Sequence, residues 1–150
     1  MTKISHFPGT RFLTSPPPQG FGIRFHVDED KSVFATITFD ESKEGGRGIL
    51  HGGAIAVVLD EAMGTAAAEQ ETPGYTVTMT YNYKSHIPLN EEITVRAWID
   101  HTEGRKVFAE CEAKLPNGMI AVTGHGIFVQ SDILKKHIME NLYIPDEESE

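Results

Sequence analysis

The stretch from Ala54 to Ala68 constrains the fold more than any other part of the chain. It reads AIAVVLDEAMGTAAA, is rich in alanine and is too long for an ordinary strand, so it predicts a helix. The residues His51-Gly52-Gly53 precede it, and Pro73-Gly74 ends it. A helix that is apolar on nearly every side belongs inside a protein. We therefore expect the rest of the chain to wrap around this segment.

Two carboxylates, Asp60 and Glu61, interrupt this apolar segment. They argue against a membrane span, and an ionised carboxylate in a core is costly unless it is paired or used. Asp60 is therefore either a functional acid or a buried carboxylate with a structural partner. Neighbouring side chains on a helix point about 100° apart, so both acids cannot face one site equally well. We expect a structural or supporting role for Glu61.

The remaining segments are typical of strands. Four of them follow the helix, at 76–86, 92–101, 105–115 and 119–130, and two precede it, at 21–27 and 32–39. The order β-β-α-β-β-β-β predicts an α+β fold, in which a curved antiparallel sheet wraps around the central helix. Short connections rich in turn residues predict that the last three strands form a meander.

The 150 residues predict a single domain, 1–150, with a core at about 20–130. Residues 131–143 add a predicted short helix, and residues 145–150 form an acidic tail that we expect to be frayed. The segment 15–20, SPPPQG, is expected to be extended rather than helical.

With 13 Lys and Arg against 22 Asp and Glu, the net charge of −9 disfavours nucleic acid and anionic membranes as partners. Residues 140–150 hold five of these acids and no Lys or Arg, so the rest of the chain is only mildly acidic. The charge therefore leaves room for an anionic ligand.

Common cofactor and nucleophile motifs are missing from the sequence. It contains no G-x-G-x-x-G, no G-x-x-x-x-G-K-[ST], no G-x-S-x-G and no H-E-x-x-H. Its seven histidines are scattered, so we expect no metal site. The single cysteine, Cys111, shares an apolar strand face and is expected in the core. Because the N-terminus lacks an apolar signal core, we expect a cytoplasmic protein.

The chain resembles the hotdog-fold acyl-CoA thioesterases, in the branch of the phenylacetate-degradation enzymes and the animal thioesterase superfamily members. Three segments carry the resemblance: GILHGGAIAVVLD at 48–60, YTVTMTYNYKSHIPL at 75–89 and the turn EGRK at 103–106. The most specific feature is HGG followed by an acid nine residues after the histidine. Where some relatives place an asparagine shortly before HGG, this chain has EGGRG at 44–48.

The resemblance implies roles for four residues in thioester hydrolysis. The Gly52 backbone N–H would stabilise the oxyanion, and a helix that begins at two glycines can supply such a donor. Asp60 would act as general base for water or as nucleophile, and Thr76 would help to position the water. His51 would orient local groups. Without the resemblance, each of these residues also has an ordinary structural interpretation.

Coenzyme A would enter as part of the substrate, and no separate cofactor is expected. Its phosphates need cations, for which Lys84, His86, Arg105 and Lys106 are candidates, with Arg47 less certain. The acyl group, fatty or aromatic, is expected along the helix beside Ala54, Val57, Val58 and Met63.

The family works as dimers, which implies a homodimer or a dimer of dimers, with His51 and Gly52 across the interface from Asp60 and Thr76. Two other functions stay open: hydration or dehydration of an acyl thioester, and non-catalytic binding of acyl-CoA. The segment HFPG at 6–9 is superficially similar to a dehydratase motif, but it precedes the first predicted strand.

Overall fold

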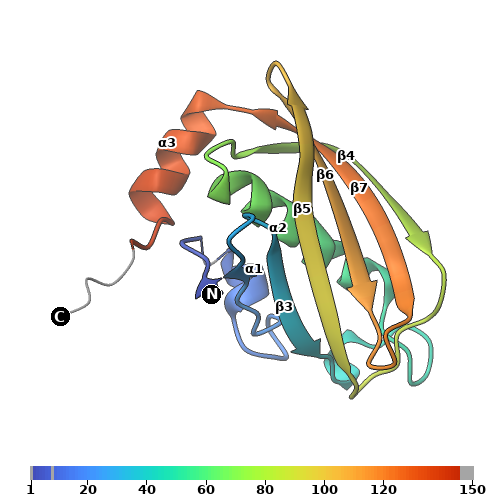
Figure 1. The fold of residues 1–150 in the computed structure, drawn as a ribbon. Helices are drawn as coiled ribbons and strands as arrows, with labels where there is room; N and C mark the ends of the chain where they lie inside the picture. Colours follow the sequence, from blue (N-terminus) through green and yellow to red (C-terminus); the bar gives the residue numbers. More distant parts are fainter. Residues whose placement is uncertain (1, 8, 146–150) are drawn as a thin grey trace.

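The computed structural model describes residues 2–7 and 9–145. In it, a single curved sheet wraps around one long helix (Figure 1). The strands are β1 (Lys3–Ile4), β2 (His26–Val27), β3 (Val33–Thr38), β4 (Gly74–Tyr83), β5 (Glu92–Glu103), β6 (Lys106–Lys114) and β7 (Ile120–Gln130). The helices are α1 (Arg11–Thr14), α2 (Gly52–Glu69) and α3 (Asp132–Asn141), with a 3-10 turn η1 (Glu41–Lys43).

The predicted order of two strands, a helix and four strands is confirmed, with one strand much shorter than expected. Of the segment 21–27, only β2 pairs with other strands, although Ile23 and Phe25 are buried in the core. The alternation of apolar residues in a sequence indicates which side chains are buried. It does not indicate whether the backbone pairs with another strand. The structure adds β1 and α1, which the sequence did not predict.

The expectation of an extended segment at 15–20 is wrong. These residues form turns, in which the Gly20 N–H donates to the Pro16 carbonyl at 3.1 Å and the Gly22 N–H donates to the Ser15 carbonyl at 2.8 Å. The backbone folds back so closely that a Cβ on Gly20 would lie 2.3 Å from the Ser15 carbonyl oxygen. Glycine at this position therefore permits the turn.

All strand pairs are antiparallel, in the order β1-β2-β3-β5-β6-β7-β4. The strands β5, β6 and β7 are neighbours, which confirms the predicted meander. β4 follows α2 in the chain but crosses to the far side of the sheet and pairs with β7. Within the described residues, β4 is therefore an edge strand.

The sheet covers most of α2 but leaves one of its sides less covered. Ala-rich turns of the helix are buried against the sheet, and Val58, Leu59 and Met63 are fully buried. Fully burying such a side chain stabilises a fold by roughly 1.5–3 kcal/mol. The less covered side contains Ala56, Val57, Asp60, Glu61 and Gly64.

Three further expectations concern single features. Cys111 is buried, as expected, and burial raises the pKa of its thiol to about 12. Helix α3 confirms the predicted short helix, while residues 146–150 of the acidic tail lie outside the described residues. None of the helices built from residues 2–7 and 9–145 is long and apolar enough to cross a membrane.

Candidate active site

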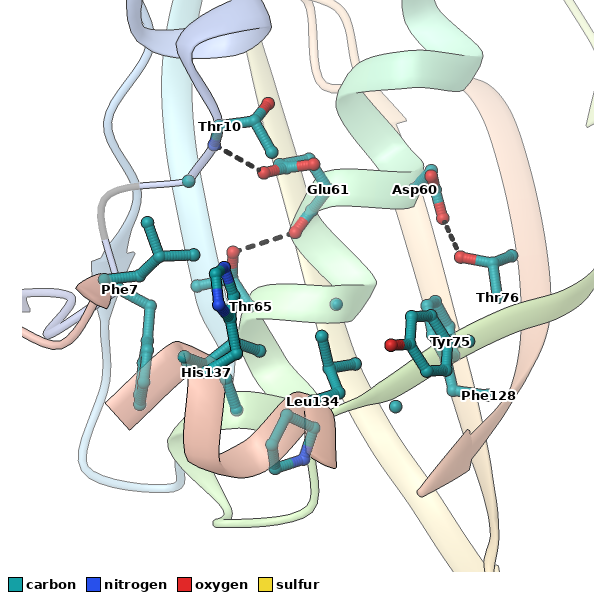
Figure 2. A pocket seen from close by; sticks show the side chains of 17 residues that line it. Phe7, Thr10, Asp60, Glu61, Thr65, Tyr75, Thr76, Phe128, Leu134 and His137 are labelled. Atoms are coloured by element: carbon teal, nitrogen blue, oxygen red, sulfur yellow. Dashed lines mark hydrogen bonds between the residues drawn. The ribbon is translucent and has the colours of Figure 1, made fainter. Parts of the chain in front are cut away.

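The structure brings Asp60 and Thr76 together from two different elements. The hydroxyl of Thr76, near the start of β4, donates to Asp60 Oδ1 on α2 at 2.9 Å (Figure 2). Partial burial raises the pKa of Asp60, and the hydrogen bond from Thr76 opposes this shift. A carboxylate held in this way can accept a proton from a neighbouring group.

A β-bulge in β4 gives Thr76 its orientation. Side chains of a regular strand alternate between its faces, so Thr76 and Tyr81 would face opposite sides. The register between β4 and β7 shifts between Thr76 and Thr78, which inserts one extra residue. As a result Thr76 faces α2, and the Tyr81 hydroxyl also faces α2 and donates to the Ala56 carbonyl at 3.1 Å.

The N-terminus of α2 presents a backbone N–H group. His51 is the N-cap, and its Nδ1 accepts the Gly53 N–H at 2.8 Å. Gly52 is the first residue of the helix. Its N–H donates to no acceptor within residues 2–7 and 9–145. Tyr83 on β4 fixes the backbone here by donating its hydroxyl to the Gly52 carbonyl at 2.7 Å. Burial raises the pKa of Tyr83, which keeps that hydroxyl protonated.

Asp60 and the Gly52 N–H lie too far apart in one chain to act on the same atom. Eight residues of α-helix separate them, which corresponds to about 12 Å along the axis. A general base must lie within about 3 Å of the water that it activates, and an oxyanion donor within about 3 Å of the carbonyl oxygen that this water attacks. Within one protomer, the two candidate groups are therefore not together.

The four candidate cations fall into two groups. Lys84 and His86 line a cavity of about 420 Å³ beside Gly52, just beyond the end of β4. Arg105 and Lys106 lie level with its other end, two strands away, where Arg105 is 3.7 Å from Asp132 and the Arg105 carbonyl accepts the Gln130 N–H. Because β4 has ten residues, the two groups are about 30 Å apart. Arg47 lines neither this cavity nor the one at Asp60.

A second cavity, of about 280 Å³, opens at Asp60 and Thr76 (Figure 2). Glu61 also lines it and accepts the Thr10 N–H on Oε1 at 3.0 Å. Burial raises the pKa of Glu61, the charge of Asp60 adds to this, and the Thr10 N–H opposes it. The expectation of a supporting role for Glu61 fits this bond, since the bond ties the N-terminal segment to α2.

The four residues expected beside the acyl group lie on two sides of α2, with Val57 on the less covered side. Ala54, Val58 and Met63 belong to the core under the sheet, so they do not line the cavity at Asp60. On α2, Gly64, Thr65 and Ala68 line it together with the two acids. Spacing along a helix assigns residues to faces, but it does not tell which face the sheet covers.

Sequence reasoning missed the tyrosines that fix the backbone of α2. Tyr81 and Tyr83 are two residues apart in the segment YNY, and their spacing alone could have placed both on one face of the strand. Across the described part of the chain, no three His, Cys, Asp or Glu side chains cluster closely enough to hold a metal ion.

Comparison with known proteins gives consistent matches. The family model of the thioesterase superfamily matches residues 47–122, just over half of the chain. Acyl-coenzyme A thioesterase THEM4 of Rattus norvegicus is 35% identical over 114 residues, which cover 74% of this chain and 46% of that protein. The chain spans less than half the length of the curated relatives that it matches.

Solved structures share the fold. A thioesterase superfamily protein is 28% identical with a TM-score of 0.73, over 75% of this chain and 55% of the other. A thioesterase from Streptococcus pneumoniae, solved with coenzyme A, is 19% identical with a TM-score of 0.63, over 65% of this chain and 80% of the other. Two variants of that protein carry alanine in place of an aspartate and of a threonine 16 positions apart. These similarities confirm the expected hotdog fold.

Proposed function

The chain belongs to the thioesterase superfamily, and from this premise we propose that it hydrolyses the thioester bond of an acyl-coenzyme A. The observation that carries the proposal is the hydrogen bond between Thr76 and Asp60, two residues that line a cavity. Asp60 and Thr76 are 16 positions apart, as are the two residues replaced in the streptococcal thioesterase. The curated relatives named acyl-coenzyme A thioesterases support the substrate class.

In the proposed reaction Asp60 acts as general base. Its carboxylate takes a proton from a water molecule, and the resulting hydroxide attacks the thioester carbonyl carbon. The negative charge that develops on the carbonyl oxygen is stabilised by the Gly52 N–H at the positive end of the α2 dipole. The intermediate then collapses, the C–S bond breaks, and the leaving thiolate takes the proton back from Asp60. The Thr76 hydroxyl occupies Asp60 Oδ1, which leaves Oδ2 for the water.

The proposed enzyme is a homodimer in which two protomers pair through β4. Tyr75, Val77, Met79 and Tyr83 on this edge strand are exposed in a single chain, although large apolar side chains favour burial. A two-fold axis through the middle of β4 would bring the start of one strand to the end of the other. Gly52, which lies beside Tyr83, would then approach Asp60 and Thr76 of the other protomer.

The same pairing would serve the phosphates of coenzyme A. Lys84 and His86 lie beyond the end of β4, and Arg105 and Lys106 lie level with its start, two strands away. If two β4 strands pair antiparallel, Lys84 and His86 of one protomer lie at the same end of the strand pair as Arg105 and Lys106 of the other. We therefore assign all four residues to the nucleotide part of the substrate.

The test is thiol release from a panel of alkyl- and aryl-CoAs by wild type and Asp60→Asn. Asparagine can still accept the Thr76 hydrogen bond but cannot take a proton, so kcat should fall by about 10²–10⁴. The neighbouring substitution Glu61→Gln is the matched control, and it should lose far less activity. An Asp60→Asn enzyme as active as wild type would overturn the role of Asp60.

The same panel separates the two alternative functions. Hydration of crotonyl-CoA without thiol release would assign the chain to hydration chemistry. Tight binding of acyl-CoA with no turnover of any panel member would make the protein a binding module. Either result would contradict the proposed hydrolysis.

A further inference from the structure

The cavity at Asp60 continues away from the reacting groups and ends against α3. Asp60 and Thr76 line one end of it, while Leu134, Ile138 and Leu142 line the opposite wall. Figure 2 shows α3 across the cavity from the two acids, with Leu134 and His137 on it. The cavity has a volume of about 280 Å³.

The far wall comes from outside the part of the chain that matches the family model. That match ends at residue 122, whereas α3 spans Asp132–Asn141. On the N-terminal side the cavity is closed by Phe7, Gly9 and Thr10, which also precede the match. The Asp60 end of the cavity therefore lies within the region that matches the family model, and its other end is built by segments outside that match.

Helix α3 lines the cavity but is not part of the buried core. Leu134 and Ile138 on the helix and its C-cap Leu142 recur every four positions and so share one face, His137 also lines the cavity, and no side chain of α3 is fully buried. Ile133 on the outer side is 81% exposed. Ser131 caps the helix by accepting the Leu134 N–H, and the Ile144 N–H donates to the His6 carbonyl behind it. Changes on the inner face can therefore alter the cavity without opening the main core.

We propose that α3 closes the acyl end of the active site and that Leu134 and Ile138 set the longest acyl group that the enzyme accepts. This proposal rests on the proposed thioester hydrolysis, which places the carbonyl at Asp60 and the acyl group in the cavity behind it. An apolar cavity of about 150 Å³ holds one benzene ring. A space of about 280 Å³ that ends against α3 suits an arylacyl or medium-chain acyl group.

The experiment measures kcat/KM for hexanoyl-, octanoyl-, dodecanoyl-, palmitoyl- and phenylacetyl-CoA. Wild type should prefer the hexanoyl, octanoyl and phenylacetyl substrates to palmitoyl-CoA. Ile138→Ala should raise the dodecanoyl-to-hexanoyl ratio by about tenfold, and Ile138→Trp should lower it by about tenfold. Leu134→Ala and Leu134→Trp should follow the same two directions. Ile133→Ala, on the outer side of the same helix, is the matched control and should leave the ratio unchanged.

Opposite directions for the small and large substitutions distinguish a wall from a helix that has simply detached. Detachment would shift both variants toward longer chains, and this result would overturn the proposal. Unchanged ratios in all four inner-face variants would also overturn it, as would a wild type that hydrolyses palmitoyl-CoA as well as octanoyl-CoA. No thiol release from any substrate would instead overturn the proposed function, and this proposal with it.

Discussion

The surroundings of Asp60 shift its pKa in two opposing directions. Partial burial disfavours the charged carboxylate, while the Thr76 hydroxyl stabilises it. Burial has the larger effect, so the pKa of Asp60 lies above its ordinary value of 3.8. In its proposed role as general base, Asp60 must be ionised to act, and therefore the activity should rise with pH as Asp60 loses its proton.

The first prediction at this scale concerns the pH dependence of kcat/KM. Wild type should show an acid limb above pH 3.8, and Thr76→Val should move this limb to higher pH because it removes the hydrogen bond that lowers the pKa. Thr78→Val, two residues along the same strand, is the control and should leave the limb in place. A limb that stays fixed or moves to lower pH in Thr76→Val would contradict the assigned role of the hydrogen bond.

Single residues also show how far the sequence could predict the site. Asp60, Thr76, His51 and Gly52 were singled out through the family motif and its spacing, and the structure places them in two separate pairs. The bond between Glu61 and the Thr10 N–H could not be predicted, because it joins residues 51 positions apart. Their contact depends on the path of the N-terminal segment over α2, for which the sequence has no periodic signal.

At the scale of elements, the sequence predicted one feature of β4, its strand character, and did not predict another, its bulge. Its strand character follows from β-rich composition, and the predicted segment 76–86 overlaps the observed Gly74–Tyr83. The bulge could not be predicted, since it is defined by the register of Thr76 and Thr78 against β7. The position of β4 at the edge likewise results from its crossing over the meander.

We predict that charge on this edge prevents formation of the proposed dimer. Val77 is 62% exposed in a single chain, so Val77→Lys should leave the fold intact while it disfavours strand pairing. The variant should elute as a monomer and lose most of its thioesterase activity, with an unchanged circular dichroism spectrum. Thr36→Lys introduces the same charge on an exposed position of the interior strand β3 and should remain dimeric and active. A fully active monomer would contradict the shared site.

For the whole molecule, the sequence predicted the enclosed helix and the antiparallel sheet because both follow from strong local periodicity. It did not predict β1 and α1, which have two and four residues and are held by contacts with distant parts of the chain. Leu13 of α1 is fully buried, so this short helix completes the core. Tertiary packing, rather than local propensity, therefore accounts for its presence.

The prediction at this scale uses two inactive variants. Gly52→Pro removes the proposed oxyanion donor at the first helical position, where proline is tolerated, and His51 already has the extended backbone (φ −60°, ψ 130°) that precedes proline. Alone it should lose about 10²–10³ in kcat. Mixed and refolded with Asp60→Asn, it should regain about a quarter of wild-type activity, since half of random dimers contain one intact site.

Each variant refolded alone is the control for this mixing experiment. Activity of the mixture that equals the average of the two separate variants would place the whole site within one protomer. Such a result would be incompatible with the separation of about 12 Å along α2.

The rigidity of α2 has a consequence for how two sites in one dimer relate. In the proposed assembly, each helix supplies the donor at its N-terminus to one site and the base in its middle to the other. A helix buried on most of its surface moves as a rigid rod, so a displacement at either point is transmitted to the second. Substrate binding at one site would then bias the geometry of its twin, which is the physical basis of cooperativity between identical subunits.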